Sequence, residues 1–260
     1  MHNWKVVPLS KGQLLDVRKE DILEDGLYRK CETYRGGGGY DQFPVICEKR
    51  LGRRAHQQFI VQLFGCNLDC PYCYVTREGV WGDPVKKTTE ELVRAFMRST
   101  QEVFHLMGGA PALQLSYWPE LIDELFTRTP WPLFHSDLLL TEREYKVSEI
   151  KQISRYGCLY AIDVKGTNAK EWFKNTRKPF DEAMFWSNLY NIAYRGDPDC
   201  FYFTFTGCNE SGVKQFIEQV EQKFGSALTR DWFSIDLIEY DALPYVDSRP
   251  WGAKIIEIRR

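Results

Sequence analysis

The chain has 260 residues, with 34 lysines and arginines against 36 aspartates and glutamates, so its formal net charge is −2. This balance argues against a protein devoted to binding nucleic acid or another polyanion. Hydrophobic residues make up 43% and charged residues 27%, which is ordinary globular usage and excludes a disordered, collagen-like or coiled-coil chain. No stretch approaches the roughly 18 consecutive apolar residues of a membrane span, and the first residues resemble no signal peptide, so we expect a cytoplasmic protein without membrane contact.

The first part of the chain, residues 1–55, is polar and shows little sustained periodicity. We interpret it as an N-terminal extension of strand and loop, followed by one domain over residues 56–260. Four consecutive glycines from Gly36 to Gly39 lack the G-x-G-x-x-G spacing of a nucleotide-binding loop, so we expect them to form a flexible loop.

From residue 57 onward, short apolar runs alternate with segments of helical pattern, which is typical of βα repeats. Apolar residues recur at three- and four-residue spacing over 89–96, behind a threonine cap, and over 213–224, after Ser211. Such crossover helices predict a parallel sheet, and six strands fall short of the eight of a closed barrel, which predicts an open partial barrel or an open sheet. The predicted strands cover residues 59–64, 103–107, 133–140, 159–164, 201–205 and 233–238.

Three of the eight cysteines, Cys66, Cys70 and Cys73, lie directly after the first predicted strand. In barrel enzymes the chemistry collects at the C-terminal ends of the strands, so this placement indicates an active site. One interpretation is a dithiol redox site, because Cys70-Pro71-Tyr72-Cys73 resembles the C-x-x-C motif of glutaredoxin-like proteins. Such a motif should open a helix within a small domain, whereas helix-breaking residues follow here at 79–84.

Two metal sites are also compatible with the three cysteines. A structural zinc ion requires four ligands, and His56, Cys47 or Cys158 would have to complete the set through the fold. The protein would then be a non-catalytic interaction module. An iron–sulfur cube normally takes four cysteines, so three would leave one iron open for a substrate or cofactor. We favour the iron–sulfur interpretation.

The Cys-x3-Cys-x2-Cys spacing, with Tyr72 before the last cysteine, resembles the signature of the radical S-adenosylmethionine (SAM) superfamily. The resemblance implies a [4Fe–4S] cluster on Cys66, Cys70 and Cys73, whose open iron binds SAM. It implies an enzyme that cleaves SAM reductively to methionine and a 5′-deoxyadenosyl radical, which abstracts a substrate hydrogen atom. It further implies an α/β fold with a partial (β/α)6 TIM-like barrel and a one-electron donor such as flavodoxin or ferredoxin.

Two further sequence features extend the resemblance to SAM binding. Tyr72 resembles the family's aromatic residue beside the adenine. The segment Gly108-Gly109-Ala110-Pro111 resembles the Gly-Gly-Glu-Pro segment that meets the methionine amino group. Ala110 replaces the glutamate, so only backbone carbonyls would remain there to accept hydrogen bonds.

After the fourth predicted strand, Asp163-Val164-Lys165 resembles the Asp-x-Lys segment of glycyl-radical activating enzymes, which act on a backbone glycine of a partner protein. Lys165 suits a carboxylate, and Asp163 suits an ammonium group, a ribose or a cation. The alternative for these two residues is an ion pair at the protein surface. The sequence does not decide between three substrate classes, which are a protein glycine, a peptide, and a small molecule or nucleotide.

The remaining cysteines and the histidines give no further metal motif. Cys31, Cys47, Cys158, Cys200 and Cys208 show no spacing that would hold a second cluster, and we expect them to be buried apolar residues. The histidines form no H-E-x-x-H motif and no i, i+4 pair, so the sequence assigns them no metal role. They are His2, His56, His105 and His135.

Overall fold

The computed structural model describes residues 2–9, 22–23, 26–32, 42–73, 75, 80–131, 133–225, 236–239 and 254–257. The glycine run predicted as a loop lies outside these residues. In chain order the strands are β1 (Trp4–Val6), β2 (Tyr28–Glu32), β3 (Gln57–Gln62), β4 (Val85–Lys87), β5 (Val103–Met107), β6 (Leu133–Leu138), β7 (Cys158–Val164), β8 (Phe201–Thr206), β9 (Asp236–Glu239) and β10 (Lys254–Glu257). The α-helices are α1 (Gln42–Leu51), α3 (Thr89–Ser99), α4 (Trp118–Arg128), α5 (Val147–Ile153), α6 (Ala169–Thr176), α7 (Glu182–Arg195) and α8 (Glu210–Phe224).

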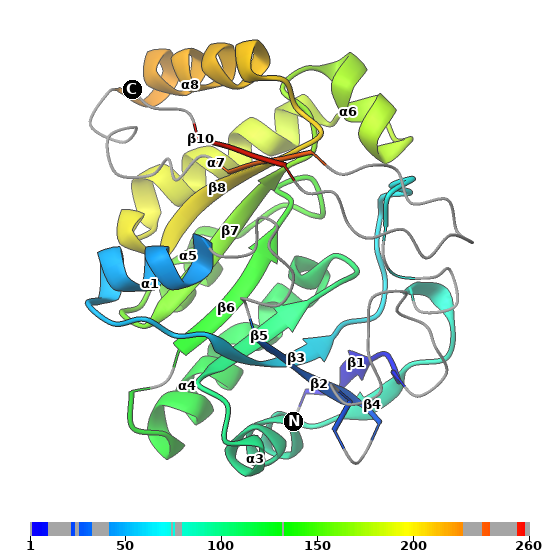
Figure 1. Cartoon of the computed structure of the whole chain (residues 1–260), viewed down its shortest axis with the longest axis vertical. Helices are drawn as coiled ribbons and strands as arrows, with labels where there is room; N and C mark the ends of the chain where they lie inside the picture. The colour runs from blue at the N-terminus through cyan, green and yellow to red at the C-terminus, as the bar shows by residue number, and fades with distance from the viewer. Residues whose placement is uncertain are drawn as a thin grey trace.

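The main sheet has eight strands in the order β10-β9-β8-β7-β6-β5-β3-β2 (Figure 1). Its six central strands pair in parallel in chain order, with helical crossovers between successive strands, whereas β2 and β10 are antiparallel at the two edges. Each edge strand has only one neighbour, so the described strands form no closed barrel. The predicted α/β fold with an open, partial TIM-like barrel is therefore confirmed. The sixth predicted strand is observed as β9, and residues 233–235 lie outside the described part.

Helices α3, α4, α5, α7 and α8 cover the outer face of this sheet. Figure 1 shows α3 and α4 at its lower end and α7 and α8 at its upper end. Because strand side chains alternate between the two faces, Phe104, Phe134 and Phe203 share one apolar core with Leu121 of α4 and Phe216 of α8. The aromatic residues of the strands thus hold the helices against the sheet.

The inner face is apolar only at the beginning of the strands. Ile46 and Cys47 of α1 form a second apolar cluster, together with the first residues of β5 and β6, Val103 and Leu133. Further along, the inner face carries buried polar side chains such as Gln62. Part of the segment 1–55 thus contributes a strand to the sheet and a helix to the floor of its interior, and the domain division at residue 55 stays a prediction.

Side-chain caps determine where two of the predicted helices begin. Thr88 caps α3, because its hydroxyl accepts a hydrogen bond from Glu91 N at 3.2 Å while its own N–H donates to the Glu91 carboxylate at 2.7 Å. Helix α8 begins at Glu210, so its predicted start after Ser211 is wrong. Its cap is Asn209, whose side-chain oxygen accepts from Gly212 N at 2.8 Å. In the described part of the chain, every helix is too short or too polar to cross a membrane.

Candidate cluster and cofactor site

The three clustered cysteines lie on the loop that follows β3, at the C-terminal edge of the sheet. Cys66, Cys70 and Cys73 line one cavity together with Gly109 and apolar side chains that include Val80. Each cysteine is partly exposed, and each is free of a disulfide bond. A metal cluster needs its thiol ligands around one space with an approach for the metal, and this arrangement meets both requirements.

Hydrogen bonds fix this cysteine loop to neighbouring parts of the barrel. The Asn67 side-chain amide donates to the Thr141 carbonyl at 2.7 Å, and Asp69 N donates to the Thr176 carbonyl at 3.0 Å. Leu68 N donates to the Cys66 sulfur at 3.4 Å. The loop is therefore held from two sides, after β6 and after α6, which limits how far the three thiols can separate.

Glycines allow the loop after β5 to pass directly beneath the cysteine loop. Ala110 N donates to the Gly65 carbonyl at 2.7 Å. Gly109 has φ +57°, and a Cβ atom there would lie 2.3 Å from the same carbonyl oxygen. Gly108 has φ +68°, and a Cβ atom there would lie 1.6 Å from Nε2 of Gln62. Of the two predicted cofactor glycines, Gly109 is thus required by the close approach of the two loops, whereas a Cβ atom at Gly108 would meet the end of the Gln62 side chain of β3.

The protonation of the cysteines favours metal binding over thiol exchange. Burial raises the pKa of Cys66 to about 12 and that of Cys70 to about 11. A reactive dithiol needs a lowered thiol pKa so that one thiolate is present at neutral pH. Buried thiols of this kind lose their protons when a metal replaces them, so the environment suits ligands better than nucleophiles.

The predicted cofactor residues Tyr72, Asp163 and Lys165 lie together beside Cys70. Lys165 forms an ion pair with Asp163, and its Nζ lies 5.6 Å from the centre of the Tyr72 ring. The side chains of Lys165 and Asp163 are only 13% and 17% exposed, so this is a largely buried pair and not one at the surface. Asp163 also accepts a hydrogen bond from the Thr206 hydroxyl at 3.1 Å. A positive and a negative group are therefore held next to the cysteine loop.

Ala110, which stands where the resembled segment has a glutamate, is buried in an apolar cluster. It packs with Leu68, Leu139 and Trp172, and Cys66 borders the same cluster. A glutamate at this position would place its carboxylate among these apolar side chains. The cofactor role predicted for Ala110 can therefore rest only on its backbone.

A carboxylate that the sequence analysis did not select, that of Glu142, lies close to this position. One of its oxygens accepts from Leu139 N at 2.9 Å, and the Ala112 backbone also donates to the carboxylate. The other oxygen is buried and has no hydrogen-bond partner among the described residues. Burial raises the pKa of Glu142 to about 8, and Glu142 in turn helps to raise the pKa of Cys66. The site thus holds a buried carboxyl group, one of whose oxygens has no hydrogen-bond partner in the described part of the chain.

A second group missed by the sequence analysis lies deeper in the barrel and contains His105, His135 and Asp137. The relevant signal is the strand register, because His105 and His135 are both the third residue of their strands and are directly paired across β5 and β6. The spacing of the two histidines along the chain does not reveal this pairing across neighbouring strands. Burial lowers the pKa of His135 to about 3, and it lowers the pKa of His105 well below the usual value. Both imidazoles are therefore neutral.

Fold and site together define an α/β partial-barrel protein with three thiols around one cavity at the C-terminal edge of its strands. The family model described as the Radical SAM superfamily matches residues 60–211, which is more than half of the chain. The chain therefore belongs to the radical SAM superfamily. Membership assigns it a [4Fe–4S] cluster and SAM as cofactors, and the three thiols around one cavity fit that cluster.

Solved structures show more distant similarity. Native anSMEcpe with bound AdoMet is 16% identical with a TM-score of 0.47, and the match covers 74% of this chain and 53% of that one. The same protein with bound AdoMet and the Kp18Cys peptide gives 16% identity, a TM-score of 0.46 and coverages of 69% and 49%. QueE from Escherichia coli gives 13% identity, a TM-score of 0.35 and coverages of 69% and 84%. The chain spans about half the length of the anSMEcpe chains it matches. No curated protein matches the sequence.

Proposed function

We propose that this protein is a radical SAM enzyme in which Cys66, Cys70 and Cys73 hold the [4Fe–4S] cluster. The observation that carries the proposal is the convergence of these three thiols on one cavity that Gly109 also lines. When bound and reduced, the cluster supplies the electron that cleaves SAM to methionine and a 5′-deoxyadenosyl radical, which abstracts a hydrogen atom from the substrate. The protein's own residues bind and orient the reactants.

The neighbouring residues offer complementary groups for SAM. Gly109 lines the cavity of the three cysteines, and without a side chain its backbone would be open to close approach by the cofactor. Lys165 supplies a positive charge for the methionine carboxylate, and Asp163 holds the lysine in place through their ion pair. Tyr72 contributes an aromatic face beside that lysine. These roles are proposals that the placement of the residues supports.

We further propose that Glu142 supplies the carboxylate that Ala110 lacks. Its unpartnered oxygen is buried beside the loop that Ala110 begins, and an ammonium group bound there would compensate the burial of the charge. Two backbone donors hold the carboxylate in one orientation, which lowers the entropic cost of binding a cation.

Replacing Glu142 by Gln tests this role with little change of shape. The amide oxygen of Gln can still accept from Leu139 N, but Gln cannot ionise when an ammonium group binds, as the Glu142 carboxyl, whose pKa burial raises to about 8, can do. A hydrogen bond to a charged group contributes about 1.5–3 kcal/mol, so SAM affinity should fall on the order of 10- to 100-fold. Equilibrium dialysis of SAM against the reconstituted protein measures this directly. The exposed neighbour Glu144, changed to Gln, is the matched control. Equal affinities for the two variants would contradict the role of Glu142.

The substrate and partners follow from the same proposal. Radical SAM chemistry needs a one-electron donor, and flavodoxin or ferredoxin would supply the electron at the cysteine loop. The Asp163-Val164-Lys165 segment favours an enzyme that activates a glycine of a partner protein, with a peptide, a small molecule or a nucleotide as the other substrate classes. Mixing the reconstituted enzyme with candidate glycyl-radical partners tests this subtype. A protein-based radical signal would support it, and its absence across all partners would count against it.

The general activity is tested by product analysis. The protein is reconstituted anaerobically with iron and sulfide, reduced with dithionite and incubated with SAM. We expect 5′-deoxyadenosine and methionine to accumulate. A colourless protein that retains zinc and leaves SAM intact would instead indicate a non-catalytic interaction module.

A further inference from the structure

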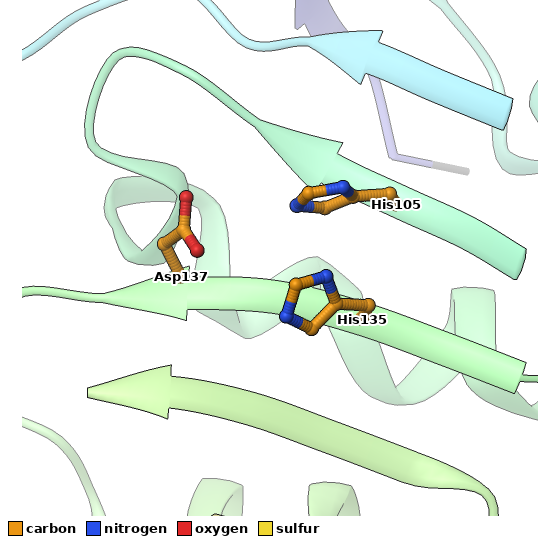
Figure 2. A group of neighbouring side chains, drawn as sticks. All are labelled: His105, His135 and Asp137. Atoms are coloured by element: carbon orange, nitrogen blue, oxygen red, sulfur yellow. The ribbon is translucent and has the colours of Figure 1, made fainter. Parts of the chain in front are cut away.

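His105, His135 and Asp137 converge in the interior of the barrel. His105 on β5 and His135 on β6 are directly paired in the parallel register. Asp137 lies two residues beyond His135, so its side chain is on the same face of the sheet. Figure 2 shows all three side chains directed into one space. Their candidate ligand atoms all lie within 4.8 Å of one another.

The hydrogen bond of His105 determines which of its nitrogens is available. Nδ1 lies 2.6 Å from the side-chain oxygen of Gln58, and a carboxamide oxygen can only accept. Nδ1 therefore carries the proton, and Nε2 presents a lone pair. His105 is only 5% exposed, and its Nε2 has no hydrogen-bond partner among the described residues. A buried lone pair of this kind is costly unless something binds it.

His135 is oriented in a similar way by a neutral oxygen. Its Nε2 lies 2.8 Å from the hydroxyl of Tyr202 on β8, and the two rings are nearly parallel at 10°. In the tautomer in which Nε2–H donates to the hydroxyl, Nδ1 carries the lone pair that a metal would bind. The centres of the His105 and His135 rings are 4.2 Å apart. Metal-binding histidines typically have one nitrogen fixed by an oxygen partner while the other binds the metal; His105 matches this pattern, and His135 matches it in the tautomer whose Nε2–H donates to Tyr202.

We propose that His105, His135 and Asp137 bind a single divalent cation of the zinc class, at a site separate from the cluster cysteines. Two imidazole nitrogens and one carboxylate oxygen make up a three-ligand set that leaves a coordination position open. The open position would accept a nitrogen or oxygen donor of a substrate within the barrel. The charges around the site are mixed, since Arg29 and Lys165 bring positive charge and Asp163 brings negative charge.

Cobalt(II) is a suitable probe, because it replaces zinc and gives visible d–d absorption that reports its ligands. The competing cluster site is removed by changing Cys66, Cys70 and Cys73 to Ala in the full, untagged chain. We expect this variant to bind one equivalent of Co²⁺ with nitrogen and oxygen ligands, and Zn²⁺ to displace it. Absorption typical of cobalt bound to thiolates, or no d–d absorption at all, would overturn the proposal.

Ligand variants then locate the ion. His105→Gln and Asp137→Asn, each in the variant without the three cluster cysteines, should abolish the d–d absorption. Tyr202→Phe should weaken Co²⁺ affinity on the order of 10- to 100-fold, because it removes only the group that orients His135. His56→Gln is the control and should bind as its parent does. Circular dichroism shows whether each variant is folded, and Asp137→Asn changes no volume in the core. Cobalt binding that survives in folded Asp137→Asn and His105→Gln would place the ion elsewhere and refute the proposal, whether or not the protein cleaves SAM.

Discussion

Changing any one of Cys66, Cys70 and Cys73 to Ser is expected to abolish the iron–sulfur cluster and SAM cleavage together. The three thiols line one cavity, and removal of one leaves two ligands for a cube that already has an open iron. The serine hydroxyl does not ionise at neutral pH and binds iron poorly, so it does not replace the lost thiolate. The measurement is iron and sulfide content after anaerobic reconstitution, with 5′-deoxyadenosine as the second readout.

Cys200→Ser provides the control for this series. Cys200 is buried and its thiol donates to the Arg155 carbonyl at 3.4 Å, a bond that a hydroxyl can keep. This variant should retain full iron content and activity. The Cys66→Ser variant is the most informative, because a dithiol mechanism uses only Cys70 and Cys73. Activity that persists in Cys66→Ser would contradict the cluster assignment.

Gly109→Ala is expected to damage both the fold and the cluster site. The added Cβ atom would lie 2.3 Å from the Gly65 carbonyl oxygen and 2.8 Å from that of Leu63. These are backbone atoms of the strand and loop that carry the cysteines, so they cannot move without displacing Cys66. The left-handed φ of +57° adds about 1 kcal/mol, and overpacking typically adds about 1–3 kcal/mol. We expect a lower thermal midpoint and a reduced iron content.

Gly52→Ala separates the cost of the left-handed backbone conformation from the cost of overpacking. Gly52 has φ +69°, but a Cβ atom there would meet nothing within 4 Å. This variant should therefore show only the conformational cost, and its iron content should be normal. If Gly109→Ala and Gly52→Ala lose the same stability and retain the same iron, the close packing of the two loops has no role in holding the cluster site.

The central sheet was predictable because its signals are local. Each inner strand has an apolar face packed against helices, so runs such as 103–107 and 159–164 stand out from the polar segments between them. The cysteine site was predictable for the same reason, since its three ligands lie within a single loop. The parallel pairing followed from the crossover segments.

The parts that could not be predicted depend on contacts between distant segments. Strand β2 joins the sheet by pairing with β3, and α1 covers the start of the interior, although the sequence of both is polar and broken. His105 and His135 meet only because their strands have one particular register. Glu142 reaches the loop after β5 from the end of β6, which no spacing along the chain indicates.

The most direct test of the central claim is the electron paramagnetic resonance spectrum of the reconstituted, reduced protein before and after SAM is added. We predict the signal of one reduced [4Fe–4S] cluster, and a change in that signal on SAM addition because the cofactor binds the open iron. The signal should be absent in Cys66→Ser. A reduced cluster whose spectrum is the same with and without SAM, or a protein that takes up no iron, would contradict the account.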